Sequence, residues 1–437
     1  MTSSIEAHEN AHVASTRSVV PTVTTLNLLV LAAVVLTSSL IVLTLVAGGV
    51  VTKHRRVADA IVDQSTPLVL GAQDLYISLA AADAMASTAF LQAGRESPEL
   101  RQQYRQHLAE AGLSLALIAG ELDPPPSMQP AIETIARELP RYAGLVETAR
   151  TNSRLQFPVG AAYLRDASDL MRVTLLPAAT SAYEEAARDL DDEYRSGASR
   201  TPLVVLLATA VGVIAVLIAT QLLVTQRTRR LLNPGLIGAT ALVVVVAVTS
   251  LVLLASQHDS LANSRTKGAD PLLVASTSRI LVLRSLSDEN LDLIERGTEP
   301  LHMDDFAAIV DSLGGSAGDS GLIADVVESD KPAIGTNQAI ELAYADYLAI
   351  HDDVRELSDA GSFDEAIDVA VSGQAAAAAR LDAALDDNVT AARIHLDREA
   401  EVARSTLERL LPVVLVLPGL AAVFAIAGIR RRIREYR

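Results

Sequence analysis

Two short patterns in this chain have residue types and spacings that could do chemistry. His8-Glu9-Asn10-Ala11-His12 matches the arrangement in which two histidines one helical turn apart bind zinc and a glutamate acts as the base. It lies in a polar tail before a long apolar run, with no domain around it to supply a third ligand or a cleft. Gly314-Gly315-Ser316-Ala317-Gly318-Asp319 lacks the lysine of a phosphate loop. We therefore expect no enzyme activity, no catalytic residue, no metal site and no cofactor.

Arginines in apolar surroundings are better candidates for a functional role. Arg279 and Arg284 flank a run of four aliphatic residues, and Arg172 lies in the mostly helical tract Tyr163–Ala179. A guanidinium in such surroundings needs an acidic partner, because its charge is costly to bury alone. The pattern leaves two interpretations open: ion pairs between helices, or contacts for a carboxylate ligand.

Three prolines lie where helices are expected to continue. Pro67, Pro177 and Pro271 each remove a backbone hydrogen bond and should bend the helix that carries them. These bends are candidate hinges, and the alternative is that they fit curved bundles.

Four apolar runs must position all of these residues. Residues 26–51, 202–224, 235–256 and 410–429 contain no Asp, Glu, Lys, Arg or His. Each is close to the length of about 20 residues that a helix needs to cross a membrane. The sequence therefore predicts an all-α membrane protein with four transmembrane helices.

The orientation follows from short arginine-rich segments, which stay in the cytoplasm. The loop 225–234 carries Arg227, Arg229 and Arg230, and the tail 430–437 begins with Arg430, Arg431 and Arg432. This places both termini, including the tail 1–25, in the cytoplasm of a multi-pass cell-membrane protein, although the basic run 53–56 opposes it. The same arginines have two readings: they set the topology, or they dock a cytoplasmic partner.

The remaining segments, 52–201 and 257–409, then lie outside the cell. Both are rich in alanine, leucine and arginine with little β-branched alternation, so we expect two tandem helical domains resembling four-helix bundles. The second is the more acidic, because residues 257–409 hold 30 acidic and 12 basic residues. No basic surface large enough to follow nucleic acid is expected. Similar pieces after the first and third runs, Thr66–Leu70 and Asp270–Val274, indicate an internal duplication.

This plan resembles the GlnX-type four-pass transmembrane transducers of actinobacteria over essentially the whole chain. The resemblance rests on the four spans, the paired outer bundles, the arginine-capped inner loop and tail, the low lysine usage and the tract Tyr163–Ala179. It implies a non-enzymatic signal transducer for amino-acid sensing. Its partners would be an extracytoplasmic amino-acid-binding lipoprotein and a cytoplasmic Ser/Thr kinase, protein kinase G.

Two other functions stay open on the residues alone. One is a direct chemoreceptor-like sensor of a small ligand, with a pocket near Arg172 or Arg279. The other is a structural scaffold of the cell envelope. Membrane lipid is an expected contact in every case, and a homodimer is a further arrangement that the sequence leaves open.

Overall fold

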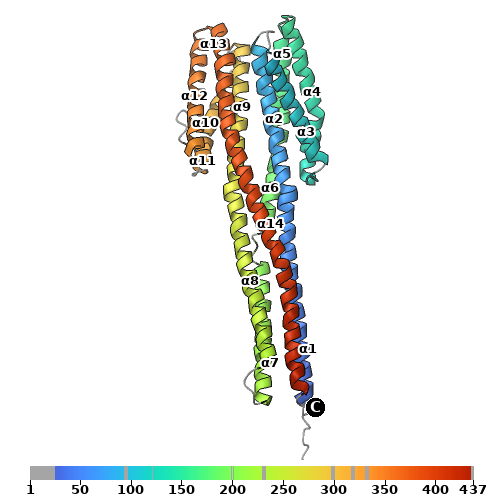
Figure 1. Ribbon diagram of the computed structural model, residues 1–437. Coiled ribbons are helices and arrows are strands. Elements are labelled where there is room, and N and C mark those ends of the chain that lie inside the picture. The colour runs from blue at the N-terminus through green and yellow to red at the C-terminus, as the bar shows by residue number, and fades with distance from the viewer. Residues whose placement is uncertain are drawn as a thin grey trace, which may run out of the picture. The chain divides into compact units, whose positions relative to one another are not determined.

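Every secondary-structure element in the described part of the chain is helical, as predicted (Figure 1). The structure, a computed structural model, describes residues 25–92, 97–120, 122–197, 199, 201–228, 233–296, 301–315, 320–329 and 334–434. The chain divides into two compact units. The apolar unit comprises Met1–Ala47, Val205–Val248 and Val413–Arg437, and the polar unit comprises Gly48–Val204 and Thr249–Pro412.

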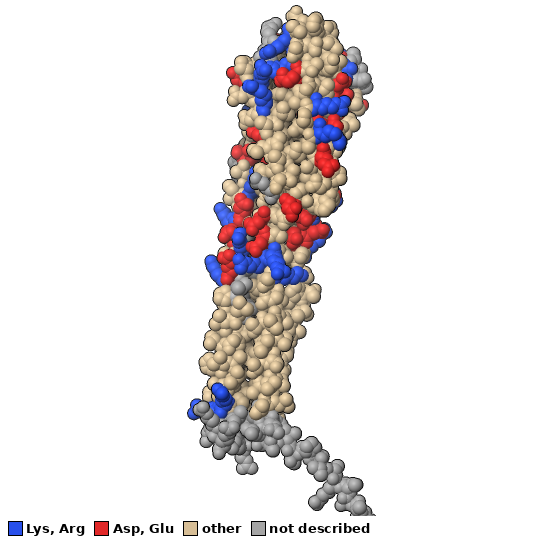
Figure 2. All heavy atoms as spheres, turned by 90° about the vertical axis from the view of Figure 1, so that its right-hand side faces the viewer, with Lys and Arg blue, Asp and Glu red and all other residues tan. Residues whose placement is uncertain are grey.

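Helices of the apolar unit expose large aliphatic side chains such as Leu31, Leu45 and Val211. Figure 2 shows a broad surface without charged side chains on the face it presents. Within this unit the Nδ2 of Asn233 donates to the carbonyl oxygen of Gly428 at 3.1 Å. A Cβ at Gly235 would lie 2.6 Å from the carbonyl oxygen of Phe424, so only glycine permits this approach between α8 (Pro234–Ser264) and α14 (Ala375–Arg434).

Three helical stretches among the described residues are long and apolar enough to cross a membrane. They are Val30–Leu91, Val159–Gln226 and Pro234–Val252. They overlap three of the four predicted spans, and the side chains of residues 410, 411 and 414 in the fourth lie outside the described residues. The fourth span stays a prediction.

The first segment and the apolar runs on either side of it form a series of helices, of which α1 and α7 lie partly in the apolar unit. The Oγ of Ser97 accepts from the backbone N–H of Leu100 at 3.1 Å, so Ser97 caps the helix that begins at Pro98. Pro140 lies inside α4 without ending it, and its side chain is exposed. The elements are α1 (Thr25–Ala60), η1 (Ile61–Ser65), α2 (Thr66–Leu91), α3 (Pro98–Gly120), η2 (Pro126–Met128), α4 (Gln129–Arg154), α5 (Val159–Leu170), η3 (Met171–Leu175), α6 (Leu176–Gly197) and α7 (Thr201–Thr228).

The second segment adds one helix that the sequence reading missed, α11, directly after the glycine-rich loop. Gly321 begins this helix with φ of 69°, a backbone conformation that favours glycine. The elements are α8 (Pro234–Ser264), η4 (Arg265–Ala269), α9 (Asp270–Glu295), α10 (Leu301–Leu313), α11 (Gly321–Ser329), α12 (Ile334–Asp359), α13 (Phe363–Val369), η5 (Ala370–Gln374) and α14 (Ala375–Arg434).

A π-helical turn precedes each of the three candidate hinge prolines. The turns η1, η3 and η4 end two residues before Pro67, Pro177 and Pro271. A proline ring clashes with the carbonyl four residues earlier, and here that carbonyl belongs in each case to the wider π turn. A fourth turn, η5, has no proline after it. Whether these positions act as hinges stays a prediction.

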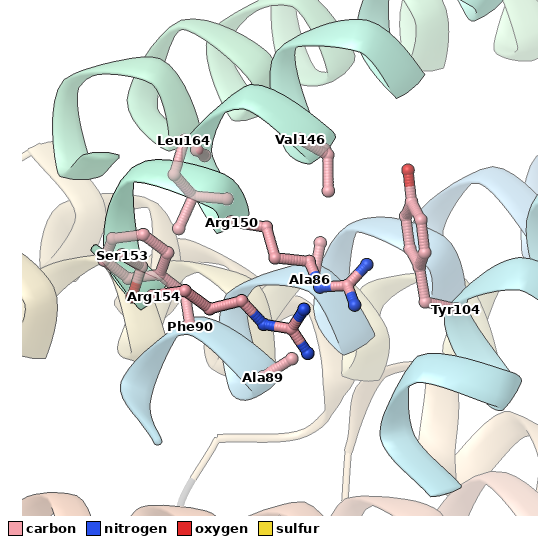
Figure 3. A pocket seen from close by; sticks show the side chains of 10 residues that line it. Ala86, Ala89, Phe90, Tyr104, Val146, Arg150, Ser153, Arg154 and Leu164 are labelled. Atoms are coloured by element: carbon pink, nitrogen blue, oxygen red, sulfur yellow. The ribbon is translucent and has the colours of Figure 1, made fainter. Parts of the chain in front are cut away.

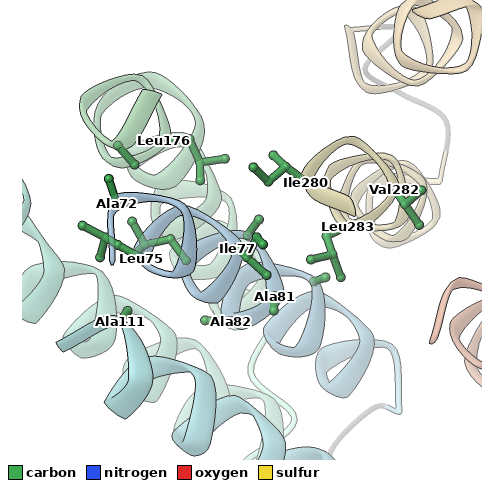
Figure 4. Packing of buried hydrophobic residues seen from close by; sticks show 14 of the residues in the cluster. Ala72, Leu75, Ile77, Ala81, Ala82, Ala111, Leu176, Ile280, Val282 and Leu283 are labelled. Atoms are coloured by element: carbon green, nitrogen blue, oxygen red, sulfur yellow. The ribbon is translucent and has the colours of Figure 1, made fainter. Parts of the chain in front are cut away.

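The two segments pack together into the polar unit, with α2 and α9 side by side (Figure 1). Both helices have 26 residues and both follow a π turn. Asp83 contacts Ser287, 204 residues later, which is also the separation of the two helix starts. The helices therefore run parallel with equivalent positions in register. Figure 4 shows Ile77 and Ala81 of α2 facing Ile280 and Leu283 of α9.

Candidate functional site

The middle and end of α9 form the most unusual region of the polar unit, because its polar side chains are buried on every side. A surface helix normally buries one apolar stripe. Here the exposed fraction of Glu289 is 1% and that of Asp292 is 3%. We call the following residues and their partners the α9 polar network: Ser285, Ser287, Asp288, Glu289, Asn290 and Asp292.

Toward the first segment, the network centres on Asp83 of α2. Its carboxylate accepts hydrogen bonds from Ser287 at 2.7 Å, Ser168 at 3.1 Å and Tyr142 at 3.2 Å. These donors come from α9, α5 and α4, so one carboxylate joins four helices. A buried carboxylate is tolerated only when it is hydrogen-bonded in this way.

A second contact between α2 and α9 lies one turn further along. The Nδ2 of Asn290 donates to the Oγ1 of Thr88 at 2.9 Å and to the Oγ of Ser87 at 3.1 Å. Polar contacts in register specify how two similar helices align more strictly than aliphatic contacts do. This pair therefore helps to set the register of the two segments.

Arg172, on the π turn η3, is one of the arginines that pair with acids of the other segment. Its Nη1 lies 3.3 Å from the Oδ2 of Asp305 and 3.5 Å from the Oδ1 of Asp288, and its Nη2 lies 3.1 Å from the Oδ1 of Asp169. Its Nη1 also donates to the Nδ1 of His302 at 3.1 Å. Because a guanidinium cannot accept, this histidine nitrogen must be the acceptor.

Away from the first segment, the acids of α9 pair with bases of α12. The Nδ1 of His351 lies 2.6 Å from the Oε1 of Glu289, and the Nη1 of Arg355 lies 2.8 Å from the Oδ2 of Asp292. The His351 ring stacks on Phe306 with its centroid 4.0 Å away. At the end of α9, Glu295 pairs with Arg165 of α5 at 2.5 Å.

Burial dominates the electrostatics of these acids. It raises the pKa of Asp288, Glu289 and Asp292 above the ordinary carboxyl values, although basic neighbours oppose the shift. The carboxyls therefore hold their protons more strongly than exposed ones do. Their charge depends on how well each basic partner is placed, so small helix movements would change it.

The arginines singled out from the sequence are divided between two places. Arg172 and Arg284 both line a small cavity of about 20 Å³ that also includes Asp83 and Asp288. Arg279 lies elsewhere, on the face of α9 toward α14, where its Nε is 2.7 Å from the Oδ1 of Asp382. It also pairs with Asp386. In this structure Arg172 and Arg279 pair with acidic residues of the chain. Binding of a carboxylate ligand by Arg172, Arg279 or Arg284 stays a prediction.

A second small cavity lies within the first segment. It has a volume of about 30 Å³ and is lined by α2, α3, α4 and α5. Figure 3 shows the guanidinium groups of Arg150 and Arg154 together with Tyr104 and Phe90 around it. The volume suits one or two water molecules rather than a metabolite.

The cytoplasmic arginines are described only in part. Arg430 and Arg431 are exposed near the end of α14. Arg229 and Arg230 lie outside the described residues, as do the side chains of Arg227 and Arg432. The motif His8–His12 also lies outside them. Within the described residues, no group of three or more His, Asp or Glu is arranged to hold a metal ion.

The sequence reading missed the acids that matter most for the core. Not every acid of the second segment is buried, because Asp352 and Asp353 of α12 are exposed. Two signals could have identified the network. Asp83 stands alone in an alanine-rich run, and Ser285–Glu295 has polar residues at positions that cover all helix faces.

Comparison with known families supports a sensory role for the first segment. Residues 57–195 match the family model described as Actinobacterial sensor domain. The match runs from the end of α1 through η1 to α6, so it includes Asp83 and Arg172 but not α9. No curated protein and no solved structure matches the chain. The similarity is consistent with signal sensing by a membrane protein of actinobacterial type, and it suggests a non-catalytic role.

Proposed function

We propose that the protein is a non-enzymatic transmembrane signal transducer. In this proposal the polar unit lies outside the cell and responds to an amino-acid-binding lipoprotein. The cytoplasmic loop and tails pass the response to a separate Ser/Thr kinase. One observation supports it above the others: the single helical stretch Val30–Leu91 contains both an apolar run long enough to cross a membrane and the start of the sensor-like region.

Such a helix can carry a signal by a small shift or rotation along its length. The π turn η1 lies in this stretch between the apolar run and Asp83 of the α9 polar network. Breaking one polar contact leaves buried charges poorly paired. The α9 polar network therefore favours a few distinct helix arrangements and disfavours the arrangements between them. Binding of a partner outside would select one arrangement, and the helix would transmit the difference.

Crosslinking in native membranes tests the proposal directly. The full-length chain is crosslinked in its own cells, purified in detergent, and its partners are identified by mass spectrometry. We expect both a solute-binding lipoprotein and a cytoplasmic kinase. Recovery of neither, under conditions that preserve other membrane complexes, would contradict the relay.

The role of the cytoplasmic arginines can be separated from their effect on topology. Arg227, Arg229, Arg230, Arg430, Arg431 and Arg432 are replaced together by lysine, which keeps the positive charge that orients the spans. Lysine lacks the planar fork that binds carboxylates in a bidentate manner. We expect normal insertion but weaker recovery of the kinase. Unchanged recovery with lysine would assign these arginines to topology.

Insertion is measurable because the chain has no cysteine. Single cysteines introduced at Asp123 and at Ser3 are treated with a membrane-impermeant maleimide on intact cells. The predicted topology requires labelling of D123C and protection of S3C.

A further inference from the structure

We propose that His302 makes the joint between the two segments of the polar unit sensitive to pH. When its ring takes up a proton, its contact with Arg172 of the first segment is lost, and contacts with Asp288 and Glu295 of α9 replace it. The inference goes beyond the proposed function and does not depend on it, because all of these residues belong to the polar unit.

His302, near the start of α10, lies between a base of the first segment and two acids of the second. Its exposed fraction is 3%. Its Nδ1 lies 3.1 Å from the Nη1 of Arg172 and 3.8 Å from the Oδ1 of Asp288. Its Nε2 lies 3.6 Å from the Oε2 of Glu295. A change in the charge of this ring therefore acts on both segments at once.

In the neutral ring, the hydrogen bond from Arg172 fixes where the proton lies. The guanidinium has only donors, so Nδ1 is the acceptor and Nε2 carries the hydrogen on the side of Glu295. An added proton can then bind only at Nδ1. It removes the acceptor and places a second positive charge next to the guanidinium, so Arg172 and His302 repel each other.

The charged ring has acidic partners within reach. A shift of about 1 Å would bring the Oδ1 of Asp288 and the Oε2 of Glu295 within hydrogen-bond distance of the ring nitrogens. Hydrogen bonds between a charged donor and a carboxylate are stronger than neutral ones. Both acids also pair with the first segment, Asp288 with Arg172 at 3.5 Å and Glu295 with Arg165 at 2.5 Å. A charged His302 competes with these arginines, so proton uptake weakens two ion pairs between the segments.

The charges nearest to His302 favour an added proton. Four acids and three arginines pair with the ring or act on its direct partners, which leaves a formal excess of one negative charge when the ring is neutral. One proton on His302 compensates this excess. The groups are Asp169, Asp288, Glu295, Asp305, Arg165, Arg172 and Arg284.

The bases of the neighbouring elements have other partners. His351 and Arg355 of α12 pair with Glu289 and Asp292, and Asp292 also interacts with the charge of His302. Arg296, after α9, lies over the ring of Phe363. The described parts of α10 and α11 add the exposed acids Asp304, Asp325 and Glu328.

Pulsed electron paramagnetic resonance tests the switch in the full-length, detergent-solubilised protein. The chain has no cysteine, so Asp166→Cys on α5 and Ala307→Cys on α10 each carry one spin label at an exposed position. We expect the distance between the labels to change by about 1–2 Å between pH 8 and pH 5, the size of helix shifts at interfaces. The change should follow the uptake of a single proton.

Variants in the labelled background identify the group that titrates. His302→Gln keeps an acceptor for Arg172 but takes up no proton, so the distance at pH 5 should stay at its pH 8 value. His302→Asn is a second variant with the same amide chemistry, and circular dichroism at both pH values checks that each variant is folded. His395→Gln is the matched control, because His395 is exposed on α14, and it should respond as the parent does.

Three results would overturn the proposal. The first is a parent protein with the same distance at pH 8 and pH 5. The second is a change in His302→Gln and His302→Asn equal to that of the parent. The third is loss of the change in His395→Gln.

Discussion

Helices α2 and α9 occupy equivalent places in the two segments, yet their interiors have opposite character. Around Asp83 the sequence of α2 is dominated by buried alanines, among them Ala81, Ala82 and Ala84. The equivalent turns of α9 bury Ser285, Asp288 and Glu289. Alanine allows neighbouring helices to approach closely, whereas buried acids need bases supplied by other helices. The same backbone plan therefore has one segment stabilised by close packing and another by paired charges.

This difference bears on where a signal would act. Close alanine packing is stable over a narrow range of helix separations, because such small side chains cannot rearrange to fill a gap. In a set of ion pairs, by contrast, the acids and bases can pair in different ways. These arrangements differ in the number of protons that the side chains bind. We therefore expect α2 to be the rigid side of the pair and α9 the side that responds. The following experiments use the melting of the full-length protein in detergent, followed by circular dichroism.

Breaking a buried ion pair of α9 should have the largest effect. His351→Phe keeps the stacking on Phe306 but leaves Glu289 without its base. Removing one partner of a buried pair costs about 3–5 kcal/mol of the free energy of unfolding. The control is His395→Phe, since His395 is exposed on α14. Equal effects of the two substitutions would contradict the paired-charge interior of α9.

The paired nature of this effect can be tested with a double variant. Combining Glu289→Leu with His351→Phe removes both charges and should recover most of the loss. Failure to recover would mean that His351 stabilises the protein through packing alone.

Exchanging apolar residues between equivalent positions should have the next largest effect. Leu286 of α9 corresponds to Ala82 of α2, and both are buried. Leu286→Ala should lower the free energy of unfolding by about 2–5 kcal/mol through the cavity it leaves. Ala82→Leu should lower it by about 1–3 kcal/mol through overpacking. Ala119→Leu, at an exposed position of α3, is the control and should be nearly neutral. A neutral Ala82→Leu would refute the close packing of α2.

The one buried acid of α2 offers a smaller test. Asp83→Ala removes an acceptor shared by Tyr142, Ser168 and Ser287, and should cost about 1–3 kcal/mol because the hydroxyls lose their partner. Asp83→Asn keeps an acceptor oxygen and should cost less. If the two variants lose the same stability, the carboxylate charge and not the hydrogen bonding carries the interaction.

The smallest effect concerns the pH dependence of stability. Because burial raises the pKa of Glu289 above its usual 4.5, the folded chain keeps this proton where the unfolded chain has released it. The contribution of Glu289 to the free energy of unfolding therefore falls as the pH rises from about 4.5 through the raised pKa. Glu289→Gln should make the melting temperature less dependent on pH over that range.

The control for the pH experiment is Asp352→Asn, because Asp352 is exposed on α12. It should leave the pH dependence of the melting temperature unchanged. A steeper dependence in the Glu289→Gln variant would show that the shift has the opposite sign.

The sequence by itself determined the helical class and the apolar runs. These depend on local properties: apolar length, the Ser97 cap, and prolines that cannot continue a regular helix. The likeness of the two segments was also visible in Thr66–Leu70 and Asp270–Val274, and an internal duplication stays a prediction. Such signals need no knowledge of distant contacts.

Only the tertiary structure decided how the two segments combine and which acids are buried. Asp83 and Ser287 are 204 residues apart, and nothing local in either helix indicates that they meet. An isolated amphipathic helix has only one buried side, so its acidic residues are expected on the solvated face. In the polar unit α9 is covered on several sides, so the same residues must find partners on α2, α5, α10 and α12. Burial is a property of the assembled helices, and it turns ordinary surface residues into the network that joins the two segments.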